Sequence, residues 1–246
     1  MNKRNIKLTL EYDGTNYCGW QKQPNAPTVE EALEKAIRKI TGENANIVGS
    51  GRTDSKVHAF GQVANFHTLS NIPGEKFALA LNGALPKDIV IRESEEKELD
   101  FHSRYWAVGK EYTYIIYNDK MRSPIRRNYS YFVNYDLDIE AMKCALNCFG
   151  GTHDFAAFMA TGSSVLGTTR TITGAQLVEN ENLIEITIRG TGFLYNMVRI
   201  IVGTLVDIGI GKIDKNQVKK IINSKDRNMA GHTAPAEGLY LSKVFY

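Results

Sequence analysis

Cysteine is scarce in this sequence of 246 residues, and no apolar signal region precedes the first predicted strand. The three cysteines, Cys18, Cys144 and Cys148, cannot all pair with one another, which excludes a disulfide-stapled miniprotein and favours a reducing compartment. We therefore expect a cytoplasmic protein. Apolar residues make up 43% and charged residues 23% of the chain, a balance that excludes a disordered or collagen-like protein and predicts a packed core.

The sequence also lacks a segment suited to crossing a membrane. Residues 193–210 approach the required length but contain Asn196, Arg199 and Asp207, which are costly side chains in lipid. We interpret this segment as a helix buried in the protein core.

Motifs of metal and nucleotide-cofactor sites are absent as well. Cys144 and Cys148 lie four residues apart and precede His153, but no second pair completes the four ligands of a zinc site. The patterns GxxxxGK[ST], GxGxxG and HExxH do not occur. We expect neither a metal nor a nucleotide cofactor.

Net charge gives no strong sign of a nucleic-acid partner. Thirty Lys and Arg against 27 Asp and Glu leave +3, so an RNA partner requires positive charge concentrated on one face. One segment interleaves basic residues with tyrosines: Lys120, Arg122, Arg126, Arg127, Tyr129 and Tyr131. These side chains suit phosphates and bases, although a solvated charged loop explains the same pattern.

Strand-like and helix-like segments mix throughout the chain. Alternating apolar residues predict strands at residues 6–12, 45–48, 62–68, 89–91, 111–117, 129–135, 174–178, 183–189 and 239–245. Apolar stripes predict helices between Thr28 and Gly42, at residues 74–85, 138–149 and 193–210, and after Asp214. Short turns join many strand pairs, which favours an α+β fold with a largely antiparallel sheet covered by helices.

The charged run at residues 93–98 is the best candidate for a boundary between the halves. We predict an N-terminal half over residues 1–98 and a C-terminal half over residues 99–246. An exposed strand edge or a loop explains the charged run equally well.

Asp54 is the first candidate for catalysis. It follows Gly51 and Arg52 in a loop between two predicted strands, and loops held by a rigid sheet commonly carry catalytic groups. The alternative is an Asx-turn in which Asp54 bonds its own backbone and Arg52 lies in solvent.

Two further candidates are a tyrosine face and an arginine. Lys110, Tyr112 and Tyr114 share one face of a predicted strand, and each base stacked on such a face contributes about 1–3 kcal/mol; cross-strand aromatic packing is the alternative. Arg199 has apolar neighbours on every side, so we expect a buried guanidinium that requires an anion or several acceptors.

These residues together resemble the TruA family of tRNA pseudouridine synthases. Residues 51–59, Gly-Arg-Thr-Asp-Ser-Lys-Val-His-Ala, are similar to the central motif of that family, except that Lys56 stands where a glycine is usual. If that glycine requires a positive φ, a lysine there is strained. The other motifs follow in the family's order at residues 10–21, 101–104, 110–114, 151–155, 193–199 and 235–240.

The resemblance implies isomerisation of uridine to pseudouridine without metal, cofactor or redox step. Asp54 would be the nucleophile, acting on a uridine that has been flipped out at a cost of about a few kcal/mol. Tyr112 would stack on the uracil, and Arg52 would help to displace it. Arg52 and Arg199 would hold the Asp54 carboxylate ionised, and we expect an ion pair between Arg199 and Asp54.

The resemblance also implies a pseudouridine synthase fold, in which a curved, mainly antiparallel sheet with flanking helices forms two related halves around a central cleft. It implies a homodimer that acts on the anticodon stem-loop of tRNA. Three alternatives remain at this point: a non-catalytic RNA-binding or chaperone protein, a pseudouridine synthase acting at a different RNA site, and a hydrolase that uses Asp54 as an N-glycosidase nucleophile.

Overall fold

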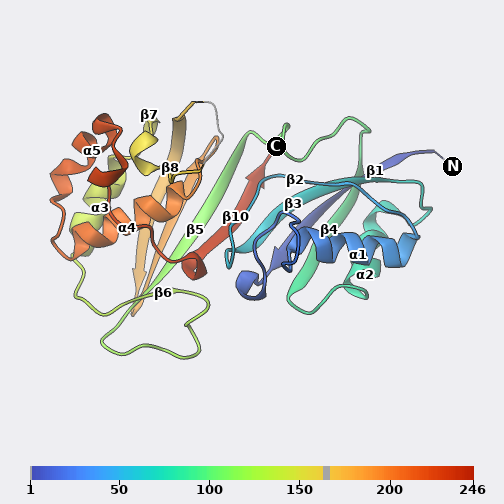
Figure 1. Cartoon of the computed structure of the whole chain (residues 1–246), viewed down its shortest axis with the longest axis horizontal. Coiled ribbons are helices and arrows are strands. Elements are labelled where there is room, and N and C mark those ends of the chain that lie inside the picture. Colours follow the sequence, from blue (N-terminus) through green and yellow to red (C-terminus); the bar gives the residue numbers. More distant parts are fainter. Residues whose placement is uncertain (1, 163–166) are drawn as a thin grey trace. The chain divides into compact units, whose positions relative to one another are not determined.

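The chain forms two compact units in the computed structural model, which describes residues 2–162 and 167–246 (Figure 1). The first unit comprises Met1–Val108 with Tyr240–Tyr246, and the second comprises Gly109–Leu239. This division falls ten residues after the boundary expected at residue 98, and the end of the chain returns to the first unit. A sequence pattern cannot show such a return, because it depends on pairing between distant strands.

The charged run that suggested the boundary is part of an edge strand. Strand β4, Ile89–Lys97, pairs only with β1, Arg4–Tyr12, in the first unit's sheet as described. Lys7 lies 2.9 Å from Glu95 across this pair, and Arg4 lies 2.6 Å from Glu96. Charged side chains on an edge strand discourage pairing with other molecules. This role accounts for the charged residues 93–98, so no linker between domains is needed to explain them.

The first unit is a sheet with two helices. Its strand order is β4-β1-β3-β10, with β2 paired to β3. The remaining strands are β2, Ile47–Gly49, β3, His58–Thr68, and β10, Leu239–Phe245. Helices α1, Val29–Thr41, and α2, Phe77–Asn82, lie together on one face of this sheet (Figure 1).

Helix α1 begins and ends where its sequence predicts. The Thr28 hydroxyl accepts a hydrogen bond from the Glu31 amide, and Gly42 ends the helix at φ 78°. The apolar stripe of α1 includes Leu33 and Ile37, which are fully buried against the sheet together with Leu8 of β1. This packing gives the strands of the first unit a rigid base.

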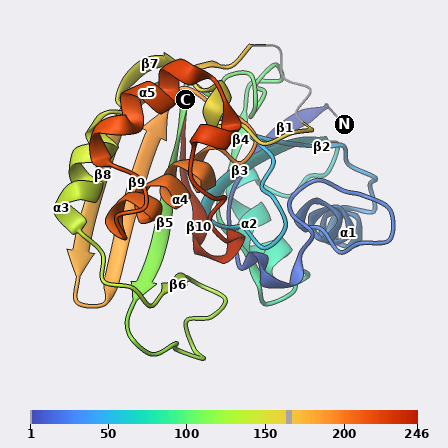
Figure 2. The same cartoon turned by 60° about the vertical axis from the view of Figure 1, so that its left-hand side comes forward.

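The second unit contains five strands and three α-helices among its described residues. Its strand order is β5-β9-β8-β7, with β6 paired to β5. The strands are β5, Gly109–Asn118, β6, Tyr131–Val133, β7, Gly151–Asp154, β8, Thr169–Asn180, and β9, Leu183–Gly190. Figures 1 and 2 show α3, Ile139–Asn147, α4, Met197–Gly209, and α5, Val218–Ser224, gathered on one face of this sheet.

Helix α4 confirms the buried helix expected near the end of the chain, with a later start. It begins at Met197 rather than at residue 193, and every residue in it except Arg199 is buried. A helix that is apolar all round belongs inside a protein core. Among the residues that the structure describes, none of the helices combines the length and apolarity needed to span a bilayer.

Strand pairing in both units is mainly antiparallel. The exceptions that the structure describes are the pair of β10 with β3 and the pair of β5 with β6, which run parallel. The fold is therefore α+β with mixed, mainly antiparallel sheets and flanking helices, as the sequence predicts.

Candidate active site

The loop that carries Asp54 connects β2 to β3 and is fixed to the sheet from one side. The Ser50 amide donates to the Val63 carbonyl at 2.7 Å, and the Ser50 hydroxyl donates to Gln62 Oε1 at 2.7 Å. Gln62, which is fully buried, returns a hydrogen bond from Nε2 to the Gly51 carbonyl at 2.9 Å. Because both the oxygen and the nitrogen of this buried side-chain amide are hydrogen-bonded, Gln62 holds the start of the loop rigidly.

Residues 13–21, which we call the brace segment, hold the other side of the same loop. The Trp20 amide donates to the Thr53 carbonyl at 3.0 Å, and the Lys56 amide donates to the Tyr17 carbonyl at 3.2 Å. These bonds lie one residue before and two residues after Asp54, which is half-buried. The catalytic candidate therefore sits on a backbone that is fixed at both flanks.

Two glycines allow the brace segment to approach the loop this closely. A Cβ atom on Gly19, which has φ +92°, would lie 2.4 Å from the Thr53 carbonyl oxygen and 3.1 Å from the Asp54 carbonyl carbon. A Cβ atom on Gly14 would lie 2.1 Å from the Val57 carbonyl oxygen. Only a residue without a side chain fits these positions.

His58 is a buried side chain that contacts the start of the brace segment. Its ring is 2% exposed and stacks on Tyr240 with centroids 4.7 Å apart. The Gly14 amide donates to Nδ1 of His58 at 3.0 Å, while Asp13 Oδ1 lies 3.2 Å from the same nitrogen. A nitrogen that accepts from an amide carries no proton, so we assign the neutral tautomer with the proton on Nε2. His58 thus has a structural role in the motif.

Lys56, which stands where the family usually has a glycine, adopts a positive φ. Its φ is +65°, and the residue is exposed. The left-handed conformation costs a residue with a side chain about 1–2 kcal/mol. The position therefore does suit a glycine, and this chain retains a strained lysine next to its catalytic candidate.

Arg52 is held by a short relay that the sequence did not reveal. Its Nε donates to Gln21 Oε1 at 3.0 Å, and Gln21 Nε2 donates to Glu30 Oε2 at 2.8 Å. Glu30 lies in the first turn of α1, also accepts from the Lys22 amide at 2.7 Å, and is 7% exposed. Burial raises the pKa of this carboxyl. The Glu30 contact orients the Gln21 amide so that its oxygen faces Arg52.

The two tyrosines expected to share a stacking face have different environments. Tyr114 is fully buried and its hydroxyl donates to the Pro235 carbonyl at 2.6 Å, so its ring is not available to a base. Tyr112 is half-buried and forms an edge-to-face contact with Phe193, with centroids 5.1 Å apart. The alternation of side chains along β5 places both tyrosines on one face of the strand. The turn at Pro235 contacts Tyr114.

Arg199 is half-buried rather than buried, because α4 starts late and places it in the first turn. Its Nε donates to the Ala234 carbonyl and its Nη1 donates to Asn196 Oδ1, both at 2.7 Å. Asn196 precedes the helix in the left-handed conformation, at φ 59°. These two neutral acceptors fix the plane of the guanidinium.

The basic segment after β5 partly lines a pocket within the second unit. Arg122, Arg126 and Arg127 contribute to its wall together with Tyr131. Tyr129 is exposed and stands outside that lining.

No cluster that could hold a metal occurs among residues 2–162 and 167–246. Cys18, Cys144 and Cys148 are all free thiols.

Comparisons with known proteins show which family the chain belongs to. A family model described as tRNA pseudouridine synthase matches residues 9–106 and 145–246. The chain is 55% identical to tRNA pseudouridine synthase A of Acetivibrio thermocellus, 54% to that of Thermoanaerobacter pseudethanolicus and 53% to that of Clostridium acetobutylicum. Each alignment covers 99% of this chain and 100% of the relative. With the Asp54 loop inside the first matched range and Arg199 inside the second, this chain belongs to the tRNA pseudouridine synthase family.

Proposed function

We propose that this protein isomerises uridine to pseudouridine in tRNA, with Asp54 as the nucleophile. The observation that carries the proposal is the Asp54 loop, which is fixed by backbone hydrogen bonds at Thr53 and Lys56. A nucleophile held on a rigid backbone needs little reorganisation when the substrate arrives. The bond from uracil N1 to ribose C1′ breaks, the base rotates, and C5 bonds to C1′; the C5 proton leaves and N1 takes up a proton, so substrate and product have the same composition.

The other site residues have proposed roles toward the same uridine. Tyr112 stacks on the flipped base, in keeping with its half-buried ring. Arg52 assists displacement of the base, and Arg52 and Arg199 together keep the Asp54 carboxylate ionised. The proposed target is a uridine in the anticodon stem-loop, which rests on the family resemblance.

The direct test is incubation of the protein with unmodified bulk tRNA, followed by mass spectrometry of nucleosides and mapping of each modified position. Pseudouridine in the anticodon arm is the expected result, and pseudouridine elsewhere would overturn the target alone. Release of free uracil would instead identify an N-glycosidase. Binding without either product would identify a non-catalytic RNA-binding protein.

The Gln21 relay gives a prediction about Arg52. Gln21→Ala removes the acceptor that fixes the Arg52 guanidinium, so the rate of pseudouridine formation should fall about tenfold, which corresponds to about 1.4 kcal/mol. Thermal stability should change little because Gln21 is exposed. The matched control is Gln217→Ala, an exposed glutamine of the second unit whose side chain makes no hydrogen bond among the contacts described. Equal rates for both variants would show that the relay does not position Arg52.

Arg199→Lys tests the guanidinium rather than the charge. Lysine keeps the cation but loses the planar fork that contacts Asn196 and Ala234. We expect tRNA binding near the wild-type level and a rate at least about tenfold lower. Arg92→Lys is the control, since Arg92 forms a surface ion pair with Glu11 and such pairs contribute little. If Arg199→Lys forms pseudouridine at the wild-type rate, the planar guanidinium of Arg199 is not required for the reaction.

We also propose that the protein is a cytoplasmic homodimer. Its three free thiols support a reducing compartment, and the dimer rests on the family resemblance. Light scattering during size-exclusion chromatography measures the mass directly. A mass of one chain at micromolar concentration would contradict the dimer.

A further inference from the structure

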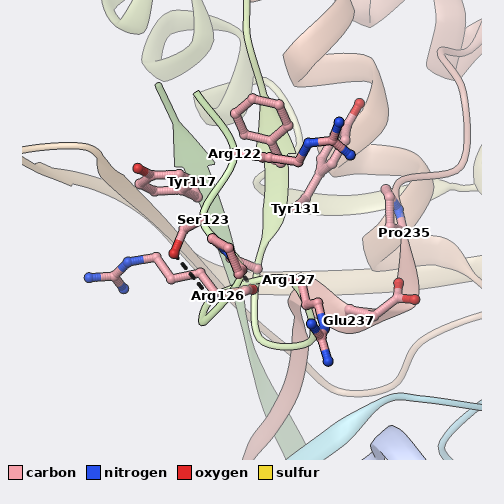
Figure 3. Close-up of a pocket in the computed structure, with 11 residues that line it drawn as sticks. Tyr117, Arg122, Ser123, Arg126, Arg127, Tyr131, Pro235 and Glu237 are labelled. Atoms are coloured by element: carbon pink, nitrogen blue, oxygen red, sulfur yellow. Dashed lines mark hydrogen bonds between the residues drawn. The ribbon is translucent and has the colours of Figure 1, made fainter. Parts of the chain in front are cut away.

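A pocket of about 550 Å³ lies within the second unit, apart from any residue given a catalytic role above. The segment between β5 and β6 forms one wall, and the turn before β10 forms another (Figure 3). All of this segment falls between the two ranges that the family model matches. The pocket's size is within the range of sites that bind small organic groups.

The cations of this pocket are not neutralised by the protein. Within the described parts of the chain, neither Arg122 nor Arg127 forms an ion pair or a side-chain hydrogen bond, and both line the pocket. Figure 3 shows these two side chains on different sides of it. Arg126 differs from them, because its guanidinium lies over the Tyr117 ring at 5.7 Å and is directed away. Two unpaired guanidiniums at one concavity attract a phosphate.

Tyr131 lines the same pocket, and its hydroxyl contacts a histidine. Its oxygen lies 3.1 Å from Nε2 of His232, and Nδ1 of His232 lies 3.0 Å from Asp207 Oδ2. Asp207 is 8% exposed and also accepts from the His232 amide at 3.1 Å. This chain of contacts runs from the core helix α4 to the pocket wall.

The direction of these hydrogen bonds follows from the carboxylate at their inner end. Asp207 can only accept when ionised, so Nδ1 of His232 carries the proton and Nε2 is the acceptor. The Tyr131 hydroxyl therefore donates to His232 and offers lone pairs elsewhere. Burial and the charge of Asp207 raise the pKa of Tyr131, which keeps the hydroxyl protonated.

The remaining walls are largely apolar or aromatic. Tyr117, Phe132 and Pro235 line the pocket, and Glu237 contributes one carboxylate to the lining. Aromatic walls beside cations are the usual features of sites for unstacked nucleotides. A duplex cannot use such a pocket, because its bases remain stacked inside the helix.

We propose that this pocket binds one unstacked nucleotide from a single-stranded part of the tRNA substrate. The phosphate lies against Arg122 and Arg127, the base packs on the Tyr131 side, and the Tyr131 oxygen accepts a hydrogen bond from the base. The nucleotide is additional to the uridine that undergoes isomerisation. This inference rests on the proposed function for the identity of the RNA, and its tests below use binding as well as activity.

The first test compares two double variants that lower net charge equally. Arg122→Gln with Arg127→Gln removes the pocket cations, whereas Lys219→Gln with Lys220→Gln removes exposed charges of α5. With an unmodified tRNA transcript, the pocket pair should weaken affinity about tenfold or more. It should also reduce the slope of log affinity against log salt by about 0.7, the value for one phosphate of a single strand.

Equal losses in the two double variants would overturn the pocket, because they would reveal only general attraction between charges. An unchanged slope of log affinity against log salt in the variant with Arg122→Gln and Arg127→Gln would also overturn the pocket. Pseudouridine formation at saturating tRNA should stay near the wild-type rate in the Lys219→Gln, Lys220→Gln variant. If the wild type binds tRNA but forms no pseudouridine, the proposed function fails while the binding comparison still decides the pocket.

Crosslinking tests whether the ligand is a single nucleotide. A photoreactive benzoylphenylalanine replaces Phe132 inside the pocket, and the control places it at the exposed Tyr135. The Phe132 variant should crosslink the transcript at one unpaired position, and addition of excess unmodified tRNA should suppress the product. Crosslinks spread over paired stems, or the same pattern from Tyr135, would overturn the proposal.

Tyr131→Phe separates the hydroxyl from the ring. The variant keeps the aromatic wall, so crosslinking from Phe132 should continue at the same tRNA position. Loss of the accepted hydrogen bond should weaken tRNA binding several-fold, in line with about 1 kcal/mol for a net hydrogen bond. Unchanged affinity in Tyr131→Phe would overturn the assigned contact between the Tyr131 oxygen and the base.

Discussion

Asp54→Asn is expected to abolish pseudouridine formation while leaving the fold and tRNA binding nearly intact. The amide has almost the same shape as the carboxylate but lacks its negative charge, so it cannot act as a nucleophile at neutral pH. The backbone contacts of the loop do not depend on that charge: the Val57 amide donates to the Asp54 carbonyl at 3.1 Å. Tritium release from tRNA labelled at uridine C5 measures the turnover.

The control for this experiment is Asp100→Asn, the same chemical change at an exposed position of the first unit. It should retain the wild-type rate, and both variants should share the melting temperature of the wild type to within a few degrees. Residual turnover above a few per cent in Asp54→Asn would remove this residue as the nucleophile. A large fall in its melting temperature would show instead that the carboxylate supports the loop.

Local elements could be predicted from the sequence because their causes are local. Thr28, Glu31 and Gly42 mark the ends of α1 through bonds within one or two turns. The strand at residues 129–135 was predicted too long, since only Tyr131–Val133 pairs with β5. Alternation shows which residues share a face, but not how far a partner strand extends.

The parts of the site that could not be predicted depend on contacts between distant segments. Gly14 and Gly19 were recognised only as members of a motif, yet each makes room for the backbone about forty residues later, at Val57 and Thr53. The hydrogen bonds from Arg52 through Gln21 to Glu30 likewise join the Asp54 loop to α1. No spacing rule predicts such pairs, because the fold alone brings them together.

Whether Lys56 is strained depends on both the sequence motif and the backbone conformation. The departure from the family's glycine was visible in the sequence, and the strain followed only if the backbone required a positive φ. The observed φ of +65° meets that condition. The strain occurs at an exposed position two residues after Asp54.

The brace segment leads to the second large expected effect, that of Gly19→Ala. The new Cβ atom would lie 2.4 Å from the Thr53 carbonyl oxygen, closer than real Cβ atoms approach backbone, so the brace or the Asp54 loop must move. A displacement of about 1 Å at a catalytic group can lower a rate about 100-fold. We therefore expect at least that loss in pseudouridine formation, with tRNA affinity much less affected.

Gly42→Ala separates this steric effect from the cost of the backbone conformation. Gly42 also has a positive φ, +78°, but a Cβ atom there would meet nothing within 4 Å. Both variants should lose about 1–2 kcal/mol of unfolding free energy from the left-handed conformation, as urea denaturation measures. Only Gly19→Ala should lose activity. If the two variants turn over tRNA at the same rate, the brace segment does not set the position of Asp54, and the loop must owe its geometry to the contacts from Ser50 and Gln62 on its other side.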